Sequence, residues 1–125
     1  MSSSKSQRVF LVEDIDIIRA HLTVALEEVS DAAVVECAAE EAEAIAWLQA
    51  NPSAWDIAVI DLFLKRGSGV GVLEACRRRE PTQRAVVLTN YATDAMRERC
   101  ISKGADRVFD KSTEIDAFLA YCAPP

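Results

Sequence analysis

Four short apolar runs recur along this chain, and each ends at charged or hydroxyl-bearing residues. The runs and the polar residues that end them are Val9–Val12 with Glu13 and Asp14, Ile57–Ile60 with Asp61, Ala85–Leu88 with Thr89, and Val108-Phe109-Asp110 with Lys111. Helical patterns lie between the runs, so the alternation predicts βα units and a parallel sheet. The carboxyl ends of parallel strands share one edge, where open α/β sheets bind ligands. We therefore expect three carboxylates, a hydroxyl and an ammonium group to meet at that edge.

Apolar spacing and turn residues predict five βα units and nothing more. The expected strands are about Arg8–Glu13, Ala33–Cys37, Ile57–Asp61, Ala85–Thr89 and Asp106–Asp110. The first helix is expected to present Ile18, Leu22, Ala25, Leu26 and Val29 at helical spacing, and the second to run over about Glu40–Ala50. We expect Thr93 to cap the fourth helix, Gly104 to close it, and Ser112 or Thr113 to cap the fifth.

Length and charge narrow the function classes. A chain of 125 residues, half of them hydrophobic, predicts one globular domain, which we place at residues 8–123 after a flexible tail at 1–7. The net charge of −6 disfavours direct binding to nucleic acid. No apolar stretch approaches a membrane span, and the first residues do not form a signal peptide, so we expect a cytoplasmic protein that does not contact membranes.

Cysteine and histidine positions exclude common metal and thiol chemistry. The four cysteines are widely spaced, no Cys-x-x-Cys occurs, and His21 is the only histidine, so the spacing of a zinc site is absent. Cys76, Cys100 and Cys122 fall on apolar helix faces. We expect them to be reduced thiols in or near the core.

The residues expected at the sheet edge suit phosphoryl chemistry. Glu13, Asp14 and Asp61 would repel one another in a shared cleft, and a hard cation such as Mg²⁺, or Mn²⁺, relieves that repulsion. A carboxylate can also attack a phosphoryl donor and form an aspartyl phosphate. Lys111 would supply positive charge to the transferred group and Thr89 a hydroxyl donor.

The ordered set of motifs resembles the receiver domain of two-component response regulators. The matching segments are Phe10-Leu11-Val12-Glu13-Asp14, Val59-Ile60-Asp61-Leu62, Val87-Leu88-Thr89-Asn90 and Phe109-Asp110-Lys111-Ser112. Each segment alone is weak, but together, in order, they cover the chain after the tail. The resemblance implies a flavodoxin-like (βα)5 fold, doubly wound, with five parallel strands in the order 2-1-3-4-5.

The resemblance also implies roles and partners. Asp61 would be the phosphoacceptor, with Thr89 and Lys111 beside the phosphoryl group. Glu13, Asp14, Asp61 and the backbone carbonyl of Phe63 would hold the metal. The phosphoryl group would come from a histidine kinase or phosphotransfer protein, and the signal would pass to a downstream protein or onward as a phosphoryl group. Such a domain is not a conventional enzyme, but it phosphorylates itself from small donors with Mg²⁺ and dephosphorylates itself.

The chain departs from the family pattern beside the site. Val108 stands where an aromatic switch residue is common, and Phe109 should face the opposite side of its strand. Ser112 replaces the proline that often follows the lysine. Phe63 and Tyr91 are bulky residues beside the reaction site, where they would hinder an attacking water and lengthen the life of the phosphorylated state.

Three alternatives accompany this interpretation. A small haloacid-dehalogenase-like phosphatase would use Asp14 as nucleophile and Asp16 as general acid, but no later acidic pair follows and Asp61 would have no role. A flavodoxin-like electron carrier is rejected because an acidic first loop would repel a flavin phosphate. The third alternative concerns the extent of the protein. Met1 and the short C-terminal tail favour a stand-alone regulator over a receiver from a longer DNA-binding regulator. The sequence leaves homodimerisation open.

Overall fold

Five strands and five helices alternate along the chain in the computed structural model, which describes residues 6–124. The strands are β1 (Arg8–Val12), β2 (Ala33–Ala38), β3 (Ile57–Ile60), β4 (Arg84–Thr89) and β5 (Arg107–Asp110). The helices are α1 (Asp16–Glu28), α2 (Glu41–Ala50), α3 (Gly69–Ala75), α4 (Asp94–Ser102) and α5 (Ile115–Tyr121), and a turn of 3-10 helix (Cys76–Arg78) follows α3. The predicted βα alternation is confirmed.

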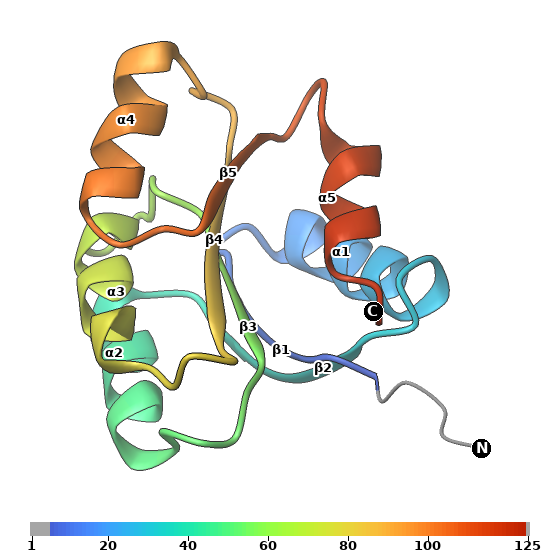
Figure 1. Cartoon of the computed structure of the whole chain (residues 1–125), viewed down its shortest axis with the longest axis horizontal. Coiled ribbons are helices and arrows are strands. Elements are labelled where there is room, and N and C mark those ends of the chain that lie inside the picture. Colours follow the sequence, from blue (N-terminus) through green and yellow to red (C-terminus); the bar gives the residue numbers. More distant parts are fainter. Residues whose placement is uncertain (1–5, 125) are drawn as a thin grey trace.

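All neighbouring strands pair in parallel, in the order β2-β1-β3-β4-β5 (Figure 1). This is the flavodoxin-like order that the resemblance implied. The central strand β3 is buried along its whole length, as its continuous apolar run predicted. The charged residues predicted at the ends of the first and third strands, Glu13 and Asp61, lie one position beyond the last paired residue.

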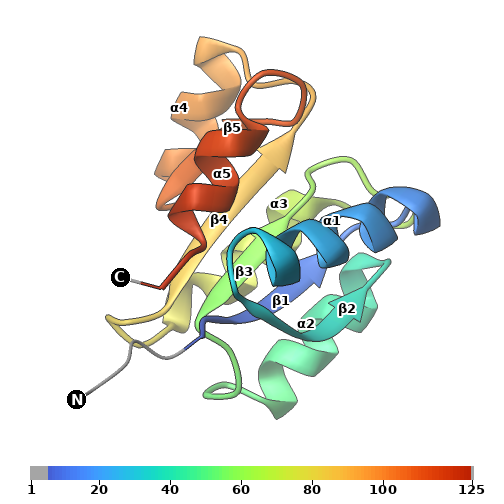
Figure 2. The same cartoon turned by 90° about the vertical axis from the view of Figure 1, so that its right-hand side faces the viewer.

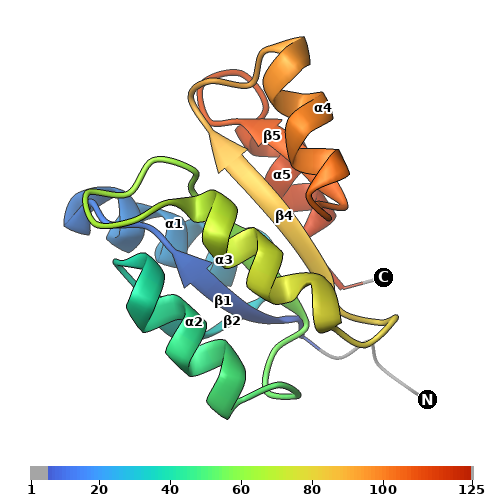
Figure 3. The same cartoon turned by 90° about the vertical axis from the view of Figure 1, so that its left-hand side faces the viewer.

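The helices form two layers, one on each face of the sheet. Figure 2 shows α1 and α5 in front of one face, and Figure 3 shows α2, α3 and α4 in front of the other. Successive strand residues therefore enter different cores: Phe10 and Val12 pack with α2, α3 and α4, whereas Val9 and Leu11 pack with α1 and α5. Two cores on one sheet hold the strand ends in fixed register.

Two local predictions were wrong. Neither Ser112 nor Thr113 caps α5, because the N-cap is Glu114 and its side chain makes no capping bond. The backbone N–H groups of Ser112 and Thr113 instead donate to Oδ1 of Asp110, so this carboxylate organises the turn before the helix. The first helix was expected to include Val29, but α1 ends at Glu28, and Val29 is its C-cap and is 67% exposed.

Other local predictions are confirmed. The Thr93 side chain accepts a hydrogen bond from the Met96 N–H and so caps α4. Gly104 follows that helix with φ of +110°, a conformation that favours glycine. All four cysteines are free thiols, and Cys76, Cys100 and Cys122 are buried.

Most of the tail predicted at residues 1–7 lies outside the described residues. Gln7, which is described, accepts a hydrogen bond at its carbonyl from the Ala33 N–H. Within residues 6–124, no helix is both long enough and apolar enough to span a bilayer.

Candidate functional site

The strand order brings together the residues that follow four separate strands. Glu13 and Asp14 come directly after β1, Asp61 after β3 and Lys111 after β5, while Thr89 is the last residue of β4. The strand register sets the height of these residues along the sheet, because Val12 pairs with Ile60, Ile60 with Val87, and Thr89 with Asp110. These predicted side chains therefore converge at the carboxyl edge of the sheet.

Three carboxylates form a cluster at this edge. One oxygen each from Glu13, Asp14 and Asp61 lies within 4.8 Å of the others. Glu13 is fully buried and Asp61 is 8% exposed, so water screens their repulsion weakly. The cluster is a place where a cation would lower the energy of the folded chain.

Asp14 carries the clearest sign of a missing partner. Its Oδ2 accepts a hydrogen bond of 2.8 Å from the Lys65 N–H, but its Oδ1 is buried without any hydrogen-bond partner. A buried carboxylate oxygen without a partner is costly. Carboxylate oxygens are ligands that Mg²⁺ and Mn²⁺ accept, so the residues present fit a divalent cation.

Lys111 supplies the positive charge of the cluster. Its Nζ lies 2.6 Å from Oε1 of Glu13 and 3.4 Å from Oδ2 of Asp61, and its side chain is only 12% exposed. The ammonium group therefore balances part of the acidic charge and stands beside the Asp61 carboxylate. The Lys111 N–H also donates to the Thr89 carbonyl, which fixes the start of the loop after β5.

The electrostatics single out Asp61. Burial raises the pKa of Asp61 to about 6, Lys111 acts in the opposite direction, and the nearby Glu13 adds to the rise. A carboxylate that is poorly solvated and held beside an ammonium group gains from any added positive charge. With this pKa most Asp61 side chains are ionised at neutral pH, and a bound cation would keep Asp61 ionised at lower pH as well.

Two backbone N–H groups connect the site to its flanking aromatic residues. The Phe63 N–H donates to Oδ1 of Asp61 at 3.4 Å, and the Tyr91 N–H donates to the hydroxyl oxygen of the buried Thr89 at 3.1 Å. The rings of Phe63 and Tyr91 meet edge to face with centroids 4.9 Å apart. Both residues were predicted beside the site, whereas the contact between their rings was not.

Val108 stands where the family often has an aromatic residue, and its backbone carbonyl accepts a hydrogen bond from an arginine. Val108 lies in the core under α2, α3 and α4, and Phe109 in the other core, as predicted. Arg97 of α4 donates to the carbonyls of Ala92 and Val108 and pairs with Glu114 at 2.6 Å. No sequence signal pointed to this contact, because it joins three segments that are separated along the chain.

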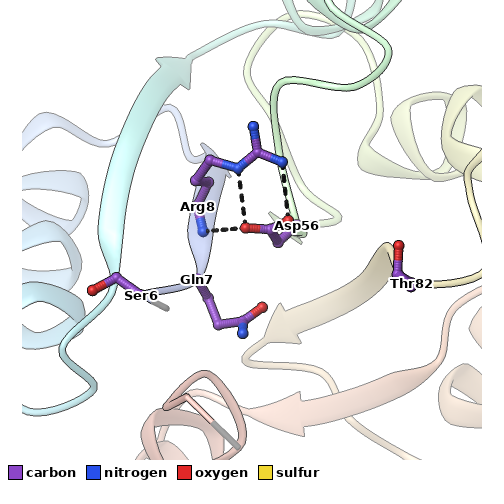
Figure 4. Close-up of a pocket in the computed structure, with 5 residues that line it drawn as sticks. All are labelled: Ser6, Gln7, Arg8, Asp56 and Thr82. Atoms are coloured by element: carbon purple, nitrogen blue, oxygen red, sulfur yellow. Dashed lines mark hydrogen bonds and ion pairs between the residues drawn. The ribbon is translucent and has the colours of Figure 1, made fainter. Parts of the chain in front are cut away.

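A separate pocket lies at the opposite, amino edge of the sheet. Its lining residues are Ser6, Gln7, Arg8, Asp56 and Thr82 (Figure 4). Arg8 donates to Asp56 through its backbone N–H, Nε and Nη2, at 2.8, 3.1 and 3.1 Å. The two charges satisfy each other, so the pocket offers no unpaired charged group.

The comparisons with known proteins agree with this geometry. Residues 9–123 match the model of the response regulator receiver domain. The chain is 36% identical over 106 residues to the photosynthetic apparatus regulatory protein RegA of Cereibacter sphaeroides, covering 85% of this chain and 55% of RegA. It is 34% identical over 98 residues to the DNA-binding transcriptional activator DevR/DosR of Mycobacterium tuberculosis, covering 78% and 44%. The chain thus spans about half the length of the curated relatives it matches.

Solved structures share the fold. A two-component response regulator of the LuxR family from Aurantimonas sp. SI85-9A1 superposes with a TM-score of 0.78 at 27% identity, covering 94% of this chain and 87% of that one. A response regulator protein from Burkholderia pseudomallei, solved with a phosphorylated aspartic acid and a calcium ion, gives a TM-score of 0.76 at 23% identity, covering 92% and 65%.

Proposed function

Because this chain belongs to the response regulator receiver family, we propose that it accepts a phosphoryl group on Asp61 and passes the signal to another protein. The observation that carries the proposal is the convergence of three carboxylates and one ammonium group, in which Oδ1 of Asp14 lacks a partner. We assign Asp61 as the nucleophile, with the metal held by Glu13, Asp14, Asp61 and the Phe63 carbonyl.

The chemistry follows from the positions of the chain's own groups. A carboxylate oxygen of Asp61 attacks the phosphorus of a phosphohistidine on a histidine kinase or phosphotransfer protein, the P–N bond breaks, and the imidazole takes up a proton. Lys111, 3.4 Å from Asp61, stabilises the charge on the transferred oxygens. The hydroxyl of Thr89 donates to one of those oxygens. When bound, Mg²⁺ neutralises further charge and orients the phosphoryl group.

Hydrolysis resets the domain. A water attacks the phosphorus of the aspartyl phosphate, the acyl phosphate P–O bond breaks, and Asp61 returns with inorganic phosphate as product. The domain therefore works as a switch that is set by phosphoryl transfer and reset by its own hydrolysis, rather than as a conventional enzyme. We place this function in the cytoplasm, where receiver domains meet histidine kinases.

The test is intact mass spectrometry with peptide mapping after incubation with acetyl phosphate and Mg²⁺. We expect one added phosphoryl group on Asp61 in the wild type, none in Asp61→Asn, and none when EDTA removes Mg²⁺. Asp116→Asn changes an exposed carboxylate on α5 and serves as the matched control, which should label like the wild type. Labelling at Asp14 that persists in Asp61→Asn would replace this proposal with a phosphatase that uses Asp14.

A further inference from the structure

The loop that joins β3 to α3, residues 61–68, carries the Phe63 carbonyl that we assigned to the metal site. This β3–α3 loop folds back on itself: Phe63 and Ser68 form an isolated antiparallel bridge, and the Gly69 N–H donates to the Leu62 carbonyl at 2.9 Å. Among residues 6–124, no backbone N–H group donates a hydrogen bond to the Phe63 carbonyl itself. The position of that carbonyl therefore depends on the contacts that hold the rest of the loop.

Two carboxylates hold the β3–α3 loop by its backbone. Oδ2 of Asp14 accepts a hydrogen bond of 2.8 Å from the Lys65 N–H. Oε1 of Glu41, in the first turn of α2, accepts one of 2.8 Å from the Ser68 N–H, and the Glu41 N–H donates to the Arg66 carbonyl at 3.1 Å. Asp14 belongs to the acidic cluster, whereas Glu41 lies outside it. One of the two supports of the loop is therefore a residue without a role in the site described so far.

The space around the Glu41 side chain is shaped for this contact. Helices α2 and α3 lie side by side on one face of the sheet (Figure 3). The Glu41 side chain occupies the space that a Cβ at Gly67 or Gly71 would take. Ser68, whose N–H is bonded to Glu41, also caps α3, because its hydroxyl accepts a hydrogen bond from the Val70 N–H. One carboxylate of α2 thus contacts both the β3–α3 loop and the first turn of α3.

Helix electrostatics explains only part of this geometry. An acidic residue in the first turn of a helix interacts favourably with the helix dipole, and Glu43 supplies such a charge to α2 as well. Glu40 pairs with Arg66 at 3.8 Å, whereas Glu41 forms no ion pair within residues 6–124. The dipole accounts for negative charge at this helix end, but it does not account for a carboxylate that accepts the N–H of a separate segment.

We propose that Glu41 is a positioning residue for the metal site: by holding the Ser68 N–H, it keeps the bridge to Phe63 formed and presents the Phe63 carbonyl to a divalent cation. This role rests on the proposed function, because it presumes the ligand set given there. Glu41 acts through the loop and does not bind the cation. A carbonyl that is held in place before the cation arrives loses less conformational freedom on binding, so the affinity for the cation is higher.

The dissociation constant of the full chain for Mg²⁺ tests this role, measured by isothermal titration calorimetry at a temperature where urea unfolding shows every variant to be folded. We expect Glu41→Ala to raise the constant by about fivefold or more, because the Phe63 carbonyl is no longer held. Glu41→Gln keeps an oxygen that accepts from the Ser68 N–H and should recover most of the lost affinity. Glu40→Ala removes the same charge from the adjacent residue, whose side chain makes no capping bond, and should bind Mg²⁺ like the wild type.

Gly71→Ala displaces the Glu41 carboxylate without removing its charge. It should raise the constant as Glu41→Ala does, and the double variant should show no further rise. An unchanged constant in Glu41→Ala would overturn the positioning role, and so would a rise in Glu41→Gln equal to that in Glu41→Ala, which would assign the effect to charge. Either result, together with labelling of Asp61, would leave the proposed function standing. A wild type that does not bind Mg²⁺ would overturn the proposed ligand set and the positioning role together.

Discussion

Tyr91 places an exposed ring next to the residue whose hydroxyl is expected to bind the phosphoryl group. Its N–H is bonded to Thr89, and its ring contacts Phe63, whose N–H is bonded to Asp61. Two rings in this position would hinder the approach of water to the phosphorus of an aspartyl phosphate. We therefore expect this residue pair to lengthen the life of the phosphorylated state.

We expect Tyr91→Ala to speed the loss of the phosphoryl group by about fivefold, which corresponds to about 1 kcal/mol in the barrier. The decay of the phosphorylated mass after removal of acetyl phosphate measures this rate. Tyr91→Phe keeps the ring and should decay like the wild type. Equal rates in Tyr91→Ala and the wild type would show that the ring does not limit hydrolysis.

Asp14 is the residue that we expect to decide how strongly the site binds a cation. Its partnerless oxygen lies with the carboxylates of Glu13 and Asp61, so removing its charge relieves repulsion and also deletes a ligand. We expect Asp14→Asn to raise the stability of the metal-free protein and to weaken Mg²⁺ binding by about tenfold or more. Thermal unfolding in EDTA and across a Mg²⁺ titration measures both effects. Asp116→Asn should reproduce the wild type, and a Mg²⁺ response in Asp14→Asn equal to the wild type's would remove Asp14 from the ligand set.

At the scale of elements, two glycines at the start of α3 make close contacts with neighbouring segments. A Cβ at position 69 would lie 2.0 Å from the Asp61 carbonyl oxygen, which is backbone and cannot move aside cheaply. A Cβ at position 71 would meet Oε2 of Glu41, the end of a flexible side chain. Glu41 also accepts a hydrogen bond of 2.8 Å from the Ser68 N–H, so it ties α2 to the β3–α3 loop.

We expect Gly69→Ala to destabilise the fold by about 3 kcal/mol or more, because the backbone at Asp61 must shift. Gly71→Ala should cost about 1 kcal/mol, the scale of one lost hydrogen bond, because Glu41 turns away from Ser68. In a Glu41→Ala background the second cost should disappear. Urea unfolding of both glycine variants in the wild-type and Glu41→Ala backgrounds measures these differences, and similar losses for both glycines in both backgrounds would contradict the contact argument.

Element type was predictable from the sequence, whereas one cap was not. Thr93 was identified correctly because a β-hydroxyl just before a helical pattern is a local signal. Ser112 and Thr113 give the same signal, but their N–H groups donate to Asp110 in a turn, and the helix starts only after Glu114. Where two local motifs compete, the positions of the neighbouring segments decide between them.

At the scale of the whole molecule, the Arg8–Asp56 pair fastens the start of β1 to the residue that precedes β3, at the edge opposite the acidic cluster. The pKa of Asp56 is lowered, mainly by the side-chain hydrogen bonds from Arg8. A carboxylate whose folded pKa lies below its unfolded value stabilises the fold above the unfolded pKa of about 3.9. That contribution is lost as the pH falls through the folded pKa.

We expect Arg8→Met to lower the free energy of unfolding by about 1 kcal/mol at pH 7, a modest figure because both side chains are partly exposed. The difference from the wild type should shrink below pH 4 as Asp56 takes up a proton in both proteins. Urea unfolding at a series of pH values measures the gap, with Arg78→Met as the exposed control. A gap that stays constant down to pH 2 would mean that lost packing, rather than the ion pair, causes the destabilisation.

The sequence by itself determined the fold class and the chemical composition of the site. Apolar runs of strand length that end at Glu13, Asp61, Thr89 and Lys111 are local patterns, and parallel strands necessarily direct their carboxyl ends to one edge. Only the tertiary structure decided which of those groups touch. The partnerless oxygen of Asp14, the ring contact of Phe63 with Tyr91, and the bonds from Arg97 to Val108 and Glu114 depend on loop paths and strand register. Such contacts join residues far apart along the chain, and local periodicity carries no information about them.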